Sequence, residues 1–219
     1  PEVMEKKVVI VGATGLIGNA LLHEFIQEPK VSEIRIFVRR QIEGLPTKVK
    51  QFVTDFQDLA VIKEQVVGDV IYCCVGTTRK KTPDLTDYRN IDFGINIGMA
   101  KLAKENGFST VHLISAMGAS TTARIFYSKL KGEIEEALKE LHFTNCYIYQ
   151  PSMLIGARTE SRRMEFIAQK LCPFFDLFMR GSMKDYHSIK ATQIAASMRQ
   201  NLGKEKEGIH VLRYADMMA

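Results

Sequence analysis

The sequence predicts an α/β protein with a doubly wound parallel sheet, and two observations support this fold class. Short runs rich in β-branched residues alternate with longer helical segments, which is the pattern of consecutive βαβ units. The runs are also continuously hydrophobic, as in Lys-Lys-Val-Val-Ile-Val-Gly at 6–12, which is typical of strands buried on both faces of a parallel sheet. The predicted strands are 8–11, 34–38, 49–53, 70–75, 111–114 and 146–149, with 209–212 as a candidate edge strand.

The order of these segments also predicts where a ligand binds. Right-handed crossovers through the intervening helices produce a sheet that grows in both directions from its first strand. Ligands of such Rossmann-type sheets bind beyond the carboxyl ends of the strands, where the strand order reverses. We therefore expect functional residues at strand ends. The expected organisation is a single domain over 1–219, with 152–190 as a small substrate-side lobe or lid.

Composition and charge narrow the functional classes. No apolar run reaches the roughly 18 to 20 residues of a membrane-spanning helix, and the N-terminus lacks the apolar core of a signal peptide, so we expect a cytoplasmic protein. The formal charge of +5 is modest and its Lys and Arg residues are dispersed, which argues against a nucleic-acid partner and favours a local anionic ligand. We predict no metal site and reduced, buried thiols, because metal-ligand spacing is absent among Cys73, Cys74, Cys146 and Cys172.

A glycine-rich turn follows the first predicted strand and precedes a helix over 19–27. Its glycines have the spacing GxxGxxG. The first permits a tight turn, the second lets the backbone approach a pyrophosphate, and the third allows close packing of helix on strand, while the helix N-terminus supplies amide donors. A purely structural turn is the alternative. The predicted cofactor contacts here are Gly12, Ala13, Thr14, Gly15, Leu16, Ile17 and Gly18.

The second predicted strand ends at Arg39 and Arg40, where an NAD-selective site usually has an acidic residue. Two guanidinium groups would instead pair with the 2′-phosphate of NADP(H), which is therefore the predicted cofactor. Solvated surface arginines are the alternative. The third and fourth strand ends add further predicted cofactor contacts, with local turns as the alternative: Asp55, Phe56, Val75, Gly76, Thr77 and Thr78.

The fifth predicted strand leads to Ser115, and Tyr127 and Lys131 follow at an interval of four residues. On a helix, residues i and i+4 share a face, so both side chains can point into the cleft at the end of that strand. Hydride transfer to a carbonyl builds negative charge on its oxygen, which needs a proton donor and a second hydrogen bond. We predict that Tyr127 is the acid, that Lys131 assists it and holds the nicotinamide ribose, and that Ser115 orients the carbonyl. The alternative is an ordinary helix with a half-buried tyrosine and a solvated lysine.

Further short motifs accompany these residues between 7 and about 165. They are Cys73-Cys74-Val75-Gly76-Thr77-Thr78-Arg79, Ser115-Ala116-Met117-Gly118-Ala119, Gly132-Glu133 and Glu160-Ser161-Arg162. With them, the chain resembles the atypical short-chain dehydrogenase/reductases. It is similar to the extended group of nucleotide-sugar epimerases without their large substrate domain, and most similar to the Tat-interacting-protein-like oxidoreductases. The resemblance implies NADPH binding and a triad of Ser115, Tyr127 and Lys131.

The chain departs from this pattern at two positions. The extended group usually has Arg-Pro where this sequence has Gln150-Pro151, and the segment that follows is still expected to flank the nicotinamide through Pro151, Ser152 and Leu154. The second serine after the fifth strand is here Ala116, which leaves Ser115 as the catalytic candidate, with its register uncertain by one residue.

These features favour an NADPH-dependent reductase or dehydrogenase for a small carbonyl or alcohol. A regulatory scaffold that senses NADP(H) without turnover is the main alternative, and a nucleotide-sugar epimerase is a weaker one, because little chain follows Pro151. A homodimer or a protein partner is left open. The apolar segment Met164–Arg180 is interpreted as core packing, with a lid, a subunit contact or a membrane-touching surface as alternatives, and Arg158, Arg162 and Arg163 as solvated charges or contacts for an acidic substrate.

Overall fold

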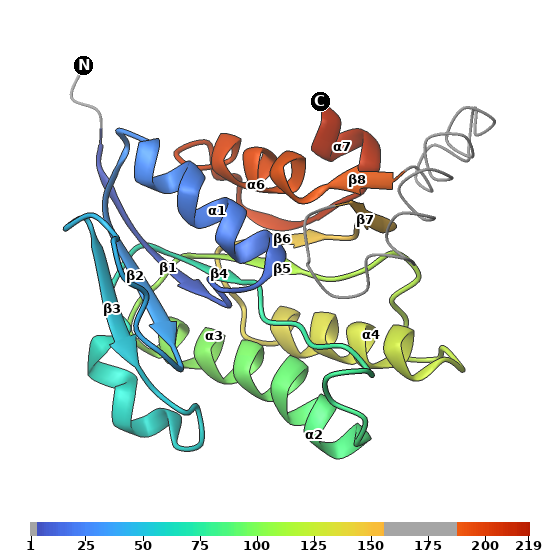
Figure 1. Ribbon diagram of the computed structural model, residues 1–219. Coiled ribbons are helices and arrows are strands. Elements are labelled where there is room, and N and C mark those ends of the chain that lie inside the picture. Colours follow the sequence, from blue (N-terminus) through green and yellow to red (C-terminus); the bar gives the residue numbers. More distant parts are fainter. Residues whose placement is uncertain (1–3, 156–187) are drawn as a thin grey trace.

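The strand order of the central sheet reverses beside its first strand, as the sequence predicts. The computed structural model describes residues 4–155 and 188–219, and over these ranges seven parallel strands pair in the order β3-β2-β1-β4-β5-β6-β9 (Figure 1). The strands of this sheet are β1 (Lys6–Val11), β2 (Val31–Val38), β3 (Val49–Val53), β4 (Val70–Cys73), β5 (Thr110–Ile114), β6 (Asn145–Tyr149) and β9 (Gly208–Leu212).

Helical segments connect the strands and cover both faces of the sheet. Two short strands, β7 (Met153–Ile155) and β8 (Ser188–Lys190), form a separate parallel pair. The helical segments are α1 (Leu16–Gln27), the 3-10 helix η1 (Leu59–Gln65), α2 (Leu85–Arg89), the π-helix η2 (Asn90–Ile95), α3 (Asn96–Glu105), α4 (Phe126–Lys139), α6 (Ala191–Gln200) and α7 (Tyr214–Met218).

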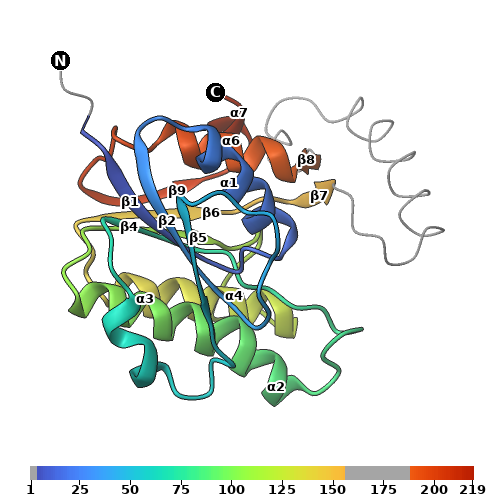
Figure 2. The same ribbon diagram turned by 60° about the vertical axis from the view of Figure 1, so that its left-hand side comes forward.

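The hydrophobic run in β1 supplies both faces of the core. Val8 and Ile10 pack into a cluster that includes side chains of α1 and α6, whereas Val9 and Val11 pack into a second cluster with α3 and α4. All four side chains have no exposed surface. Figure 2 shows the two helical layers on opposite sides of the sheet. Continuous hydrophobicity therefore reflects burial on both faces, and the predicted doubly wound fold is confirmed.

The segments that follow the sixth strand are only partly described. Strand β9 is the predicted edge strand, and α6 covers the helix predicted over 191–198. The apolar segment Met164–Arg180 and the three nearby arginines lie outside the described residues, as does most of the lobe expected at 152–190. Within the described ranges, every helix is too short or too polar to cross a membrane.

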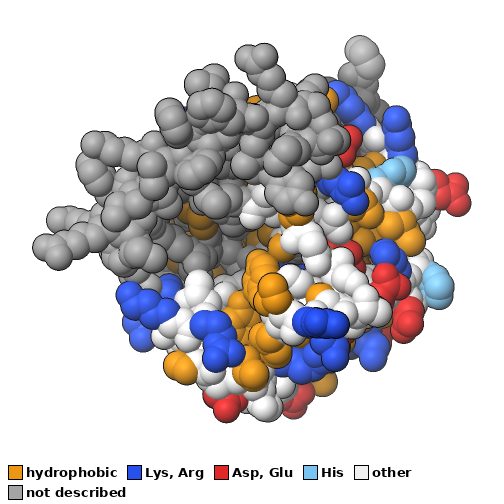
Figure 3. All heavy atoms as spheres, turned by 90° about the vertical axis from the view of Figure 1, so that its right-hand side faces the viewer, with side chains coloured by type: hydrophobic (Ala, Val, Ile, Leu, Met, Phe, Trp, Pro, Cys, Tyr) orange, Lys and Arg blue, Asp and Glu red, His pale blue; other side chains and the backbone are white. Residues whose placement is uncertain are grey.

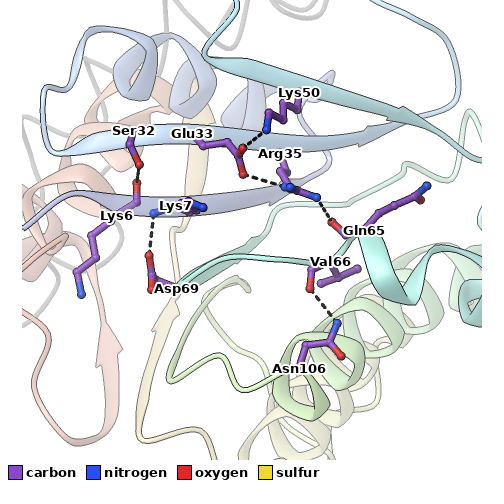
Figure 4. Close-up of polar contacts among 10 residues, drawn as sticks. All are labelled: Lys6, Lys7, Ser32, Glu33, Arg35, Lys50, Gln65, Val66, Asp69 and Asn106. Carbon is purple, nitrogen blue, oxygen red and sulfur yellow. Dashed lines mark hydrogen bonds and ion pairs between the residues drawn. The ribbon is translucent and has the colours of Figure 1, made fainter.

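Polar contacts at the amino-terminal side of the sheet fix the crossover from β3 to β4 (Figure 4). Arg35 on β2 bonds Glu33 at 2.9 Å and the carbonyl of Gln65 at 3.0 Å, and Lys50 on β3 pairs with the same glutamate. The Asn106 amide at the end of α3 donates to the carbonyl of Val66 at 2.8 Å. These contacts satisfy backbone and charged groups at this edge, which leaves the carboxyl ends of the strands as the open side.

A row of rings crosses four strands on the face covered by α6. Tyr72, His112, Tyr147 and His210 are register partners on β4, β5, β6 and β9, with ring centres 4.5, 4.7 and 4.9 Å apart. The Nδ1 atom of His112 is 2.9 Å from the hydroxyl of Tyr149. Burial lowers the pKa of His112 to about 3, so the ring is neutral in the folded protein at neutral pH.

This buried histidine predicts a loss of stability in mild acid. The unfolded chain takes up a proton on His112 below about pH 6.5, while the folded protein does not until about pH 3. The free energy of unfolding should fall with decreasing pH across this window, by up to about 1.4 kcal/mol per pH unit from this group. Urea denaturation at several pH values should show that His112→Gln removes this part of the slope. His23→Gln, on the exposed side of α1, should keep it.

Candidate active site and cofactor site

Two adjoining cavities open at the carboxyl ends of the central strands. The glycine-loop cavity, of about 620 Å³, is lined by the turn after β1 and the end of β2. The tyrosine cavity, of about 740 Å³, is lined by the end of β5 and the start of α4. Both cavities share residues 74–77 at the end of β4, so one elongated ligand could span them. On the molecular face in Figure 3, hydrophobic side chains lie beside Lys and Arg side chains.

The glycine turn has the geometry that its sequence predicts at two positions. Gly12 has a φ of +88°, and a Cβ added there would lie 2.7 Å from the backbone of Cys74. A Cβ added to Gly18 would lie only 1.9 Å from the carbonyl oxygen of Gly12, so α1 packs directly on the turn. Neither position has room for a side chain, which explains why glycine is needed at both.

The N-terminus of α1 is suited to an anionic group. Gly15 caps the helix without any side-chain hydrogen bond, and the first turn contains no acidic residue. Gly12, Thr14 and Gly15 line the glycine-loop cavity, so an anion bound there would lie near the positive end of the helix dipole. A Cβ added to Gly76 would meet nothing within 4 Å, so the opposite wall leaves space for a ligand. These residues fit a dinucleotide pyrophosphate.

The other members of the turn have different surroundings. Ala13 is buried in the core, and Leu16 and Ile17 line the tyrosine cavity. A cofactor that spans both cavities would touch Leu16 and Ile17 through that second wall.

Arg39 and Arg40 line the glycine-loop cavity from the end of β2. Both are exposed, and neither forms an ion pair within the described ranges. Phe56 also lines this cavity and has a φ of 60°, a strained conformation for a bulky residue that is found at functional sites. Asp55 is not among the described lining residues, because its carboxylate turns back to accept from the amide of Gln57 at 2.9 Å. Its predicted contact with the cofactor stays a prediction.

The predicted tyrosine and lysine face the same cavity from α4. Tyr127 is 43% exposed at its mouth, and Lys131 is buried with its Nζ atom 5.6 Å from the centre of the Tyr127 ring. The ammonium also lies 3.4 Å from a carboxylate oxygen of Asp92, which is 1% exposed. Lys131 is thus half of a buried ion pair and not the solvated lysine of the structural alternative.

Asp92 connects three parts of the site. One carboxylate oxygen accepts from the amide of Thr77, and the other lies beside Lys131. Burial raises the pKa of Asp92, and the charge of Lys131 and the Thr77 amide oppose that rise. The neighbouring Asn96 binds both backbone polar groups of Val75 and the carbonyl of Asp92. These bonds fix the shared wall of the two cavities. Asp92 lies in the π-helix η2, a kind of turn that often marks a functional site, and Asn96 is the first residue of α3.

Ser115 lines the tyrosine cavity, but its hydroxyl already has a partner. It donates to a carboxylate oxygen of Glu135 at 2.5 Å, and the amide of Gln150 donates to the same oxygen at 2.9 Å. Ser115 and Glu135 are both buried. The hydroxyl has one proton, so while it donates to Glu135 it cannot also donate to a substrate carbonyl. Its role in orienting the carbonyl stays a prediction.

The remaining predicted contacts lie on the same walls. Val75, Gly76 and Thr77 line both cavities, and Thr78 lines the tyrosine cavity. Pro151 and Ser152 line the tyrosine cavity from the end of β6. Leu154 lies in β7, whose side chains are outside the described set, so its predicted contact stays a prediction.

A comparison with protein families agrees with this site. Residues 8–164 match the model of the NAD dependent epimerase/dehydratase family, which covers the glycine turn, both cavities and the Tyr127–Lys131 pair. The chain belongs to this family. It has the NAD(P)-binding, oxidoreductase-like fold of these proteins, and the resemblance to extended short-chain dehydrogenase/reductases is confirmed.

Proteins similar to this chain include "Protein FMP52, mitochondrial" of Eremothecium gossypii. It is 37% identical over 68% of this chain and 67% of its own length. "Protein HTATIP2" of Rattus norvegicus is 31% identical over 92% of this chain and 83% of its own length, which confirms the similarity to Tat-interacting-protein-like proteins. Other fungal relatives have the same mitochondrial designation. The expected cytoplasmic location is therefore wrong by this comparison, because composition carries no information on the compartment.

Solved structures share the fold of this chain at low sequence identity. The Bordetella bronchiseptica enzyme WbmG, crystallised with NAD, is 12% identical and superimposes with a TM-score of 0.70. The alignment covers 97% of this chain and 74% of WbmG. Such a match supports the Rossmann-type sheet alone and does not distinguish NAD from NADP.

Three buried polar residues of the site are not predicted from the sequence: Asp92, Asn96 and Glu135. Each is a polar residue of a helical segment, and each is almost fully buried. Glu135 follows Lys131 by four residues and so shares its helix face, which was an available signal. Asp92 stands between Ile91 and Phe93, where an unpaired acid would be costly, and this pattern could have indicated a buried partner.

Proposed function

We propose that the chain is an NADPH-dependent oxidoreductase of the short-chain dehydrogenase/reductase type, acting on a small carbonyl or alcohol. The observation that carries this proposal is the position of Tyr127 and Lys131 on one wall of a cavity that adjoins the glycine turn. A proton donor beside a dinucleotide site has a chemical use in carbonyl reduction, whereas a protein that only binds the cofactor has no need of it.

The side chains divide the work of reduction between them. A nicotinamide cofactor held in these cavities would supply the hydride that the carbonyl carbon accepts as the carbon–oxygen π bond breaks. Tyr127 donates its phenolic proton to the developing alkoxide, so that an alcohol forms, and it recovers a proton from solvent at the mouth of the cavity. Lys131, held by Asp92 at 3.4 Å, stabilises the resulting phenolate with its positive charge and is placed to bind the nicotinamide ribose. Oxidation of an alcohol would use the same groups in reverse.

Selectivity for NADPH rests on Arg39 and Arg40. Replacing both with alanine should weaken NADPH binding by about 10- to 100-fold, since two exposed charge-assisted contacts to the 2′-phosphate would be lost. NADH lacks that phosphate and should bind the variant nearly as well as it binds the wild type. Titration of protein fluorescence with each cofactor measures both affinities. Equal losses for NADPH and NADH would contradict the assignment of the 2′-phosphate to these arginines.

The proposed activity itself is tested in two steps. Mass spectrometry of the nucleotide that copurifies with the protein identifies the cofactor. A panel of aldehydes and ketones is then screened for NADPH oxidation by the loss of nicotinamide absorbance. Turnover of a carbonyl compound with NADPH supports the proposal. Tight binding of NADPH without turnover of any panel member would favour the alternative.

A regulatory protein that senses NADP(H) without turnover is that alternative, and one observation favours it. The hydroxyl of Ser115 is bonded to Glu135, and Ala116 occupies the next position, so neither residue offers a free hydroxyl for a carbonyl oxygen. An epimerase acting on nucleotide sugars is a weaker alternative, because the walls of the tyrosine cavity are largely apolar.

A further inference from the structure

The polar groups on the walls of the tyrosine cavity are mostly occupied by contacts within the protein. Lys131 pairs with Asp92, and the hydroxyl of Ser115 donates to Glu135. Similar contacts engage the other polar wall residues, since Tyr88 donates to a backbone carbonyl, Thr77 and Thr78 bond the segment that follows them, and Ser152 also has a partner. A ligand in this cavity therefore has few side chains with which to form new hydrogen bonds.

Among the nitrogen- and oxygen-bearing side chains of this wall within the described ranges, two form no hydrogen bond or ion pair: the hydroxyl of Tyr127 and the guanidinium of Arg79. Arg79 lies in the segment that connects β4 to α2. Its side chain is exposed and forms no ion pair within the described ranges. The charge of Arg79 reaches the cavity wall. Burial raises the pKa of the Tyr88 phenol, and the nearby positive charge of Arg79 opposes that rise. Since Asp92 balances Lys131, Arg79 provides the uncompensated positive charge of these walls.

The rest of the described wall is apolar. Its larger hydrophobic side chains include Leu16, Ile17, Ile114, Val75, Ile125 and Phe126. Phe126 packs edge-on against the ring of Tyr88 at 5.5 Å, which gives this wall an aromatic corner. A ligand that buries hydroxyl groups against such a surface loses their hydrogen bonds to water without replacement, whereas a hydrocarbon chain gains from burial.

We propose that the tyrosine cavity binds an apolar carbonyl compound with one carboxylate, which pairs with Arg79 while the carbonyl oxygen faces Tyr127. This inference rests on the proposed function and names its substrate class: oxo acids, which reduction converts to hydroxy acids. A guanidinium binds a carboxylate through two parallel hydrogen bonds. A nucleotide sugar also has an anionic group, but its hydroxyls would face the apolar wall, and its second phosphate would have no further free cation among the described wall residues.

The test uses equilibrium binding to the NADPH-loaded protein, so that it does not depend on turnover. The probes are levulinate and its longer straight-chain homologues, each with a methyl ketone at the far end, together with the methyl ester of each acid. At the best chain length, the acid should bind at least about 10-fold more tightly than its ester. Arg79→Ala should bring this ratio close to one. Lys80→Ala, which removes a neighbouring exposed charge that does not line the cavity, should leave the ratio unchanged.

The outcomes separate this inference from the proposed function. Selective, Arg79-dependent binding of an acid without NADPH oxidation would support the ligand class and contradict the proposed reaction. Turnover of neutral ketones with no preference for the acids would support the reaction and overturn the ligand class. Equal affinity for acid and ester at every length, an acid preference that survives in Arg79→Ala, or tighter Arg79-dependent binding of UDP-glucose would each overturn it.

Discussion

Replacing Tyr127 with phenylalanine is expected to reduce NADPH-dependent carbonyl reduction by a factor of about 10² to 10⁴, the usual contribution of a positioned general acid. The change removes one oxygen atom from a side chain that is 43% exposed and forms no hydrogen bond within the described ranges, so the fold should be unaffected. The affinity for NADPH should stay within about 3-fold, because the ring and the Lys131 ammonium remain. Steady-state kinetics and fluorescence titration measure the two effects.

Tyr147→Phe is a matched control, since it makes the same chemical change away from the cavities. The hydroxyl of Tyr147 accepts from the amide of Lys206 at 2.8 Å, and its loss should lower stability by about 1 kcal/mol with turnover unchanged. If Tyr127→Phe keeps more than about a tenth of the wild-type rate, Tyr127 is not the acid. A parallel loss of turnover and NADPH affinity would instead indicate that the phenol is needed for binding.

The ion pair between Asp92 and Lys131 changes the expected role of the lysine. From the sequence alone, Lys131 is expected to act as a cation on Tyr127 and the cofactor. In the structure, a buried carboxylate lies 3.4 Å from that ammonium and also bonds the Thr77 amide on the wall shared by the two cavities. Removing either partner would leave an uncompensated buried charge, which is strongly destabilising. The ion pair therefore holds Lys131 in place, and the negative charge of Asp92 also weakens the electrostatic effect of Lys131 on Tyr127 and the cofactor.

The sheet and the cofactor turn could be predicted because their signals are local. Each strand is a short run of apolar residues, and the glycine spacing sets turn and helix packing within seven residues. The interval between Tyr127 and Lys131 is likewise a property of one helix. These features need no knowledge of which distant segments meet.

The polar partners of the site could not be predicted in the same way. Asp92 and Lys131 are brought together by packing of η2 and α3 beside α4. Ser115 and Gln150, which follow β5 and β6, both donate to Glu135 of α4. An acid at a strand end can also serve a local turn, as Asp55 does when it accepts from the amide of Gln57. A sequence motif indicates which residue types lie at an edge of the sheet. The hydrogen-bond partner of each of these residues depends on tertiary packing.

Gly18 lies in the first turn of α1, and we expect Gly18→Ala to lose both stability and cofactor binding. The added Cβ would lie 1.9 Å from the oxygen and 2.7 Å from the carbon of the Gly12 carbonyl, and both are backbone atoms that cannot rotate away. The helix must therefore move relative to β1. We expect the free energy of unfolding to fall by about 3 kcal/mol, as for an overpacked core.

Cofactor binding should weaken in the same variant because the amides at the N-terminus of α1 would shift from the pyrophosphate position, and we expect a loss of at least about 10-fold in NADPH affinity. Gly94→Ala is the matched control, since a Cβ there meets nothing within 4 Å, and it should leave stability equal or slightly higher. Urea denaturation and NADPH titration on both variants separate the two effects. Wild-type affinity in a destabilised but folded Gly18→Ala would show that the cofactor does not depend on the approach of α1 to the turn.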